Sequence, residues 1–160
     1  MKRGTTLFLK IAIILIGIPV LALCIFLVPV IASFAAELYP DIVYMKYLVL
    51  IVLYSSAIPF YFALYQAFIL LSYIDKNEAF SHLSVKALKT IKNCAITISI
   101  LYVVGMPLFY LVAEKDDAPG IIVIGLIIIF ASMVIAVFAA VLQRLLQVAI
   151  DIKSENDLIV

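Results

Sequence analysis

Four long uncharged runs dominate the chain and limit what it can fold into. They span residues 11–36, 47–74, 93–113 and 118–143, and each has 21 to 28 residues. Because a helix rises about 1.5 Å per residue, each run can cross a hydrocarbon core about 30 Å thick. In lipid, only helices and closed barrels satisfy the backbone, and these runs are too long for barrel strands.

We therefore predict an all-α polytopic membrane protein with four transmembrane helices in an antiparallel bundle, forming a single membrane domain over residues 1–160. The expected helices cover residues 8–36, 46–74, 82–113 and 119–153, followed by a flexible tail, 154–160. Hydrophobic residues make up 68% of the chain. Soluble proteins contain roughly 45–50%, so the solvent for most of this chain must be the lipid bilayer.

The first run also has features of a signal peptide, because Met1, Lys2 and Arg3 precede it and Cys24 lies in a lipoprotein-like context. We favour a retained transmembrane helix. The apolar region of a signal peptide is about 7–15 residues long, which is much shorter than this run. Leu23 before the cysteine is also larger than the residue that a lipoprotein peptidase requires.

The distribution of basic residues predicts the orientation. Nine lie near one set of helix ends and only two, Lys46 and Lys115, near the other set. The nine are Lys2, Arg3, Lys10, Lys76, Lys86, Lys89, Lys92, Arg144 and Lys153. Basic residues favour the cytoplasmic side. We therefore expect both termini and the central polar segment, residues 75–92, to face the cytoplasm.

The central segment is the main polar stretch between the termini and a candidate contact surface. Ser81 suits the N-cap of a helix in which apolar residues share one face and lysines another. This face has two interpretations, a basic collar on anionic lipid or a docking surface for an acidic protein. Candidate contact residues here and in the tail are Phe80, Ser81, His82, Lys86, Lys89, Lys92, Asp157 and Leu158.

Polar side chains inside the runs form a second candidate site. Tyrosines recur at helical spacing in the second run, which favours a shared face. Tyr54, Tyr61, Tyr65, Gln66 and Tyr102 are the candidates for this intramembrane polar face. The face could bind a lipid or small amphiphile, or could pack helices through interhelical hydrogen bonds. In the fourth run, Ser132, Ala136 and Ala140 form a small-residue stripe that suits packing inside the bundle or between copies.

The sequence does not indicate catalysis. It contains no nucleophile–base pair, carboxylate pair or phosphate-binding loop, so we predict neither an enzyme nor a cofactor. One histidine and two distant cysteines do not form a structural zinc motif. The net charge of +1 does not suggest direct binding to nucleic acid.

Two polar elements carry a resemblance to a known family. Residues 77–81 (NEAFS) and 151–158 (DIKSENDL), together with the four apolar runs, resemble the bacterial family called domain of unknown function 2975. The resemblance implies an inner-membrane protein, with a small helix-turn-helix regulator as a partner. We predict a regulatory or docking protein that binds a cytoplasmic partner through its central segment and tail. The alternative is a small oligomeric transporter, pore or lipid-binding protein.

Overall fold

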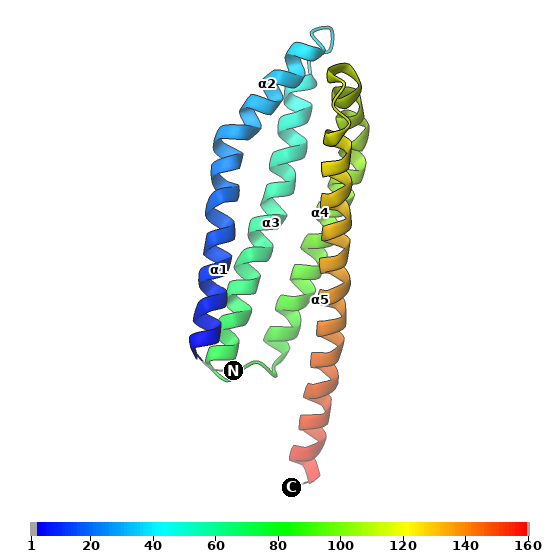
Figure 1. Ribbon diagram of the computed structural model, residues 1–160. Coiled ribbons are helices and arrows are strands. Elements are labelled where there is room, and N and C mark those ends of the chain that lie inside the picture. Colours follow the sequence, from blue (N-terminus) through cyan, green and yellow to red (C-terminus); the bar gives the residue numbers. More distant parts are fainter. Residues whose placement is uncertain (1–2, 160) are drawn as a thin grey trace.

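The computed structural model describes residues 3–159 and is built almost entirely of helices (Figure 1). Helix α1 (Arg3–Ala22), the π-helical turn η1 (Leu23–Leu27) and α2 (Val28–Leu38) form one continuous rod. Three further helices follow, α3 (Met45–Asp75), α4 (His82–Asp116) and α5 (Gly120–Ile159). Within the described residues, four helical segments are long and apolar enough to cross a membrane. The all-α prediction with four spans is therefore confirmed.

The side chains are distributed as expected for a protein surrounded by lipid. Large apolar side chains cover the outside, and Phe26 and Phe130 are 72% and 73% exposed. The residues buried between helices are mostly small, and include Ala32, Ala35, Ser56, Ser84, Ser99 and Ala136. Small residues let helix backbones approach closely, which is how helices associate where the surrounding medium is as apolar as they are. Small residues therefore outnumber large apolar residues among the buried positions of this bundle.

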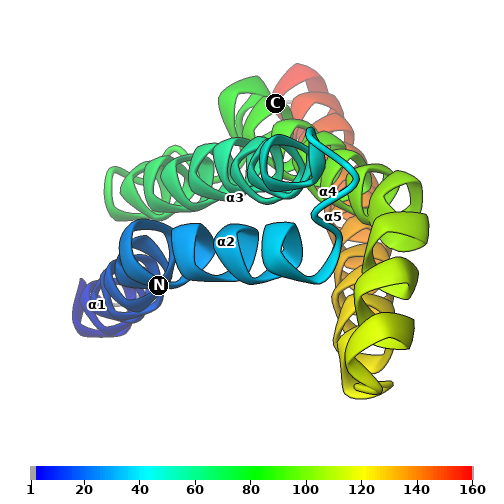
Figure 2. The ribbon, with the colours of Figure 1, turned by 90° about the horizontal axis from the view of Figure 1, so that it is seen from above.

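The helices pack mainly in chain order, with α3 in a central position. Helices α1 and α2 lie along one side of α3, α4 lies along another side, and α5 packs on α4 (Figure 2). Helix α2 also contacts α4. The α1–α2 rod, α3, α4 and α5 run alternately up and down, so both ends of the described chain lie at the same end of the bundle (Figure 1). The result is the antiparallel bundle expected from the four runs.

The two ends of the bundle differ in charge, and we name them accordingly. The acidic end holds the α2–α3 loop, residues 39–44, and the α4–α5 turn, residues 117–119. The basic end holds the start of α1, the α3–α4 turn, residues 76–81, and the last part of α5.

The core lies toward the acidic end, where Ala32, Ala35, Met45, Val49 and Val112 cluster. There the Tyr39 hydroxyl donates to the Leu111 carbonyl at 2.6 Å, which fastens the loop to α4.

Two polar residues close the turns by adopting left-handed backbone conformations. Asn77 has φ 60° and Asp117 has φ 52°. After α3, the N–H of Glu78 donates to the Tyr73 carbonyl at 2.8 Å, and after α4 the N–H of Ala118 donates to Ala113 at 2.9 Å. These are the six-to-one hydrogen bonds of Schellman motifs, which satisfy carbonyls at helix C-termini. Asn and Asp are the non-glycine residues that tolerate this conformation best.

The expected end of the last helix is wrong. We expected a helix to residue 153 and a flexible tail, but α5 remains helical to Ile159, and Val160 lies outside the described residues. Residues 144–159 contain no Gly or Pro to stop a helix, and Gln147 donates to the Asp151 carboxylate at 3.1 Å. The first helix starts at Arg3 rather than residue 8, and the other boundaries agree within three residues.

The close contact of α3 with α4 depends on Gly105. A Cβ at this position would lie 2.9 Å from Val52 Cγ1, which belongs to a stiff β-branched side chain. We expect Gly105→Ala to force the helices apart and to lower stability by about 1–3 kcal/mol. Gly120→Ala is the matched control, because a Cβ there meets nothing within 4 Å. Thermal unfolding in detergent would measure both, and equal midpoints for the two variants would contradict the contact.

Candidate functional site

The predicted intramembrane polar face divides between two sides of α3. Tyr54 and Tyr61 are seven residues apart and point toward the rod formed by α1 and η1, where both hydroxyls donate to backbone carbonyls. They border an open groove of about 520 Å³ between that rod and α3. Tyr65 is 60% exposed. Neither Tyr65 nor Gln66 makes a side-chain hydrogen bond among those found between described residues, so neither joins the two inner tyrosines.

Tyr54 donates a hydrogen bond to the Cys24 carbonyl, which has no backbone donor within the first helical rod. In η1 the N–H of Val28 donates to Leu23, five residues back, instead of to Cys24. The next residue is Pro29, which has no N–H. The Cys24 carbonyl therefore lacks a helical donor, and the Tyr54 hydroxyl donates to it at 2.9 Å. In hydrocarbon no water can donate to the Cys24 carbonyl, so the hydrogen bond from Tyr54 stabilises the contact between the two helices.

Tyr61 makes a similar hydrogen bond from α3 to α1, closer to the basic end. Its hydroxyl donates to the Gly17 carbonyl at 2.7 Å. Gly17 has no side chain, and a Cβ there would already be in van der Waals contact with Leu64, 3.5 Å away, and Tyr61. The Gly17 backbone therefore lies directly against the side chains of Tyr61 and Leu64. The geometry of Tyr54 and Tyr61 is that of interhelical packing, one of the two interpretations of this face.

Tyr102 lies apart from these tyrosines, on α4. Its hydroxyl oxygen is 3.2 Å from Ser56 Oγ, and Ser56 also donates to the Leu53 carbonyl of its own helix at 2.8 Å. The Tyr102 and Phe109 ring centroids are 5.9 Å apart. These two rings line a second cavity, of about 270 Å³, whose walls come from α2, α3, α4 and α5.

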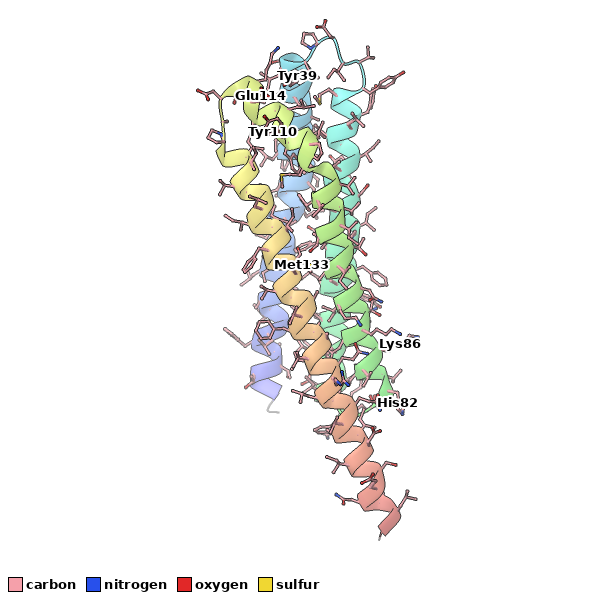
Figure 3. The ribbon with its side chains drawn as sticks, turned by 90° about the vertical axis from the view of Figure 1, so that its right-hand side faces the viewer. Tyr39, His82, Lys86, Tyr110, Glu114 and Met133 are labelled. Carbon is pink, nitrogen blue, oxygen red and sulfur yellow. The ribbon has the colours of Figure 1, made fainter. Side chains whose placement is uncertain are left out.

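At the basic end, the start of α4 has the predicted cap and the predicted two faces. Ser81 has an extended backbone and its Oγ accepts from the Ser84 N–H at 3.4 Å, while its hydroxyl donates to the Glu78 carbonyl at 2.7 Å. Leu88 is buried, whereas Lys86 and Lys89 are exposed. Figure 3 shows His82 and Lys86 at this end, with Glu114 and Tyr39 at the opposite end. Phe80 is also exposed, at 58%.

A polar cluster that the sequence analysis did not anticipate joins α1 to the end of α3. Lys10 Nζ lies 2.9 Å from Asp75 Oδ2, and the fully buried Thr6 donates to the other carboxylate oxygen. The Lys10 ammonium is also 5.3 Å from the Phe68 ring centroid. Lys10 and Asp75 are 21% and 23% exposed, so the pair is partly shielded from solvent. The signal available in the sequence was the i, i+4 spacing of Thr6 and Lys10, but nothing there pointed to Asp75.

The last part of α5 projects beyond the other helices and is exposed (Figures 1 and 3). We call residues 144–159 the α5 extension. Residues 151–158 are exposed throughout, and they include the candidates Asp157 and Leu158. Leu145, Val148 and Ile152 follow one face at helical spacing and are 61%, 50% and 53% exposed. Leu146 and Ile150, on the opposite side, are partly buried. The extension therefore presents a free apolar stripe.

The small-residue stripe of α5 packs within the chain. Ser132 and Ala136 are buried, and nearby the Ser99 hydroxyl of α4 donates to the Ile129 carbonyl of α5 at 3.3 Å. Ala140 is partly buried. These residues pack inside the bundle, and a contact between two copies through the stripe stays a prediction. Among residues 3–159, no group of three or more His, Cys, Asp or Glu side chains could hold a metal ion.

The hydrogen bond from Tyr54 gives a direct test of this arrangement. Tyr54→Phe leaves the Cys24 carbonyl without a donor, and we expect a loss of about 1–3 kcal/mol and a midpoint lowered by a few degrees. Tyr65→Phe is the matched control on the same helix and should change the midpoint little. Thermal unfolding in detergent measures both. A Tyr54→Phe midpoint no lower than that of the control would show that the carbonyl finds another donor.

Comparison with known proteins places the chain in a family. The family described as "Protein of unknown function (DUF2975)" matches residues 30–160. The "Uncharacterized membrane protein YoaS" of Bacillus subtilis (strain 168) is 76% identical over 160 residues, covering 100% of both chains. No solved structure matches the chain. With four apolar spans and this relationship over its whole length, the chain belongs to the DUF2975 family and is a multi-pass membrane protein.

Proposed function

We propose that the protein is a membrane-resident docking protein whose basic end lies in the cytoplasm and binds a soluble partner protein. The single observation that carries this proposal is the apolar stripe on the α5 extension. Leu145, Val148 and Ile152 continue the exposed apolar side of α5 beyond Gln143, the last residue of the fourth uncharged run. Exposed apolar side chains on a helix that continues past its membrane span are characteristic of an interaction surface.

The length of the extension supports a partner other than lipid. Ile152 lies eight residues beyond Arg144, about 12 Å along the helix. The head-group layer on each side of the hydrocarbon core is only about 5–7 Å thick. Because the extension contains no Gly or Pro, it continues straight from the span and does not turn into the plane of the membrane. The stripe at Ile152 is therefore beyond the reach of acyl chains.

The charges on the extension indicate the chemistry of the partner. Asp151 and Glu155 flank the stripe at an i, i+4 spacing, and both are exposed. An amphipathic helix of this kind binds in an apolar groove, and its acidic edge fits a rim of Lys and Arg. The small helix-turn-helix regulator implied by the family resemblance is the candidate partner, because DNA-binding proteins carry basic surfaces. Lys86 and Lys89 of α4 lie at the same end and offer a second, basic contact surface.

Orientation can be tested by labelling cysteines in sealed cells. In a background in which Cys24 and Cys94 are replaced by Ser, we expect a membrane-impermeant maleimide to label Asp117→Cys but not Lys86→Cys. Permeabilised cells serve as the control and should label both positions. Labelling of Lys86→Cys alone in intact cells would place the basic end outside the cell and remove the docking proposal.

Docking can be tested with a matched pair of substitutions on neighbouring residues. Ile152→Gln replaces an apolar residue of the stripe, and Lys153→Gln changes an exposed residue off the stripe. We expect Ile152→Gln to weaken co-purification of the tagged regulator about tenfold, the effect of losing roughly 1.4 kcal/mol of apolar burial. Lys153→Gln should stay within about twofold. Equal retention by the two variants, or no retention by the unchanged protein, would contradict the proposal.

A further inference from the structure

The second cavity lies at the opposite end of the molecule from the proposed docking surface. Its volume is about 270 Å³, and α2, α3, α4 and α5 all contribute to its walls. The lining includes one residue or more from each helix, among them Ile31 of α2, Val49 of α3, Phe109 of α4 and Ile128 of α5. It borders the core cluster at the acidic end and stays within the uncharged runs.

The lining excludes water as the natural occupant. Tyr102 is the one lining residue with a polar side-chain group, and its hydroxyl lies within hydrogen-bond distance of Ser56. A buried water needs about 2–4 polar partners, and an apolar cavity of about 150 Å³ is known to stay dry and to bind small apolar molecules. This cavity is larger and equally apolar, so a hydrocarbon group is the occupant that suits it.

The length of the cavity along α4 suits a lipid tail. Its lining on α4 runs from Tyr102 to Val112, ten residues or about 15 Å along the helix. That is half of a hydrocarbon core about 30 Å thick, which is the depth of one leaflet. Phe34 and Ile124 of the lining are 41% and 61% exposed, so the cavity opens sideways to the surrounding lipid. A chain could therefore enter without crossing the protein.

We propose that this cavity binds one acyl chain of a phospholipid from the leaflet at the acidic end, with the chain parallel to α4. Tyr102 forms the floor near the middle of the bilayer, and Val112 and Ile121 lie at the head-group side. The bound chain fills space that side chains leave between four helices. The proposal is independent of docking, which concerns the basic end.

Photo-crosslinking of the unchanged full-length protein tests the proposal first. The protein is reconstituted into phosphatidylethanolamine–phosphatidylglycerol vesicles that contain a trace of phosphatidylcholine with a diazirine in its acyl chain. We expect adducts on Phe109 and Ile128 at least as often as on Val104, which is 72% exposed to lipid. Adducts that follow exposure, concentrated on Val104 and lacking at Phe109 and Ile128, would overturn the proposal.

A pair of neighbouring substitutions provides the second test. Ile128→Trp fills the cavity, whereas Ile127→Trp makes the same change at a position 61% exposed to lipid. Native mass spectrometry in mild detergent should find one retained phospholipid on the unchanged protein and on Ile127→Trp, and at least fivefold less on Ile128→Trp. Equal retention by the two variants, or none by the unchanged protein, would overturn the proposal.

The folding of each variant is checked by its helical circular dichroism. If Ile128→Trp does not fold, Val112→Phe fills the cavity from α4 with Val104→Phe as its control, and the same fivefold difference is expected. Retention of the partner by Ile128→Trp should equal that of the unchanged protein, because the extension is untouched. Failure of lipid retention and failure of docking are thus separate results.

Discussion

The structure depends on one constraint, that hydrocarbon cannot hydrogen-bond to a polypeptide backbone. Every N–H and C=O within the bilayer must find its partner inside the protein. Pro29 and the π-helical turn before it break this rule locally at Cys24, and a tyrosine from α3 restores it. Together with the Tyr61–Gly17 hydrogen bond, this contact holds the first span on α3, the helix against which α1 packs. A local backbone irregularity thereby helps to decide which helices are neighbours.

The same solvent explains where the helices touch and where they do not. Since lipid is as apolar as the side chains, association requires close backbone contact, and Gly105, Ser99 and Ala136 provide it along α4 and α5. Near the acidic end an apolar cavity remains among α2, α3, α4 and α5, and we propose that a lipid acyl chain fills it. At the basic end, α5 continues past the other helices (Figure 1). The proposed lipid site thus lies among the helices at the acidic end, and the proposed docking surface lies on the α5 extension at the basic end.

Much of the fold could be predicted because the signals were local. The uncharged runs located the spans, and Ser81 marked the start of α4 with its cap and its exposed lysines. The end of α5 differs from the expected flexible tail, because residues 144–159 carry charges but contain nothing that breaks a helix. Helical spacing predicts a shared face for the tyrosines of α3, but it does not say which neighbouring helix that face meets. In the structure, Tyr54 faces α1 and η1 while Tyr102 meets Ser56 on another side of α3, so one predicted site became two.

The sequence by itself determined that the chain crosses a membrane in four helices, because hydrophobic length and charge act over a single segment. Only the tertiary structure decided that Lys10 meets Asp75, 65 residues away, that Tyr54 satisfies the Cys24 carbonyl, and that an apolar cavity remains among four helices. Each of these depends on the rotation of one helix against another. That rotation follows from the packing of many small residues at once, and no single segment of the sequence contains it.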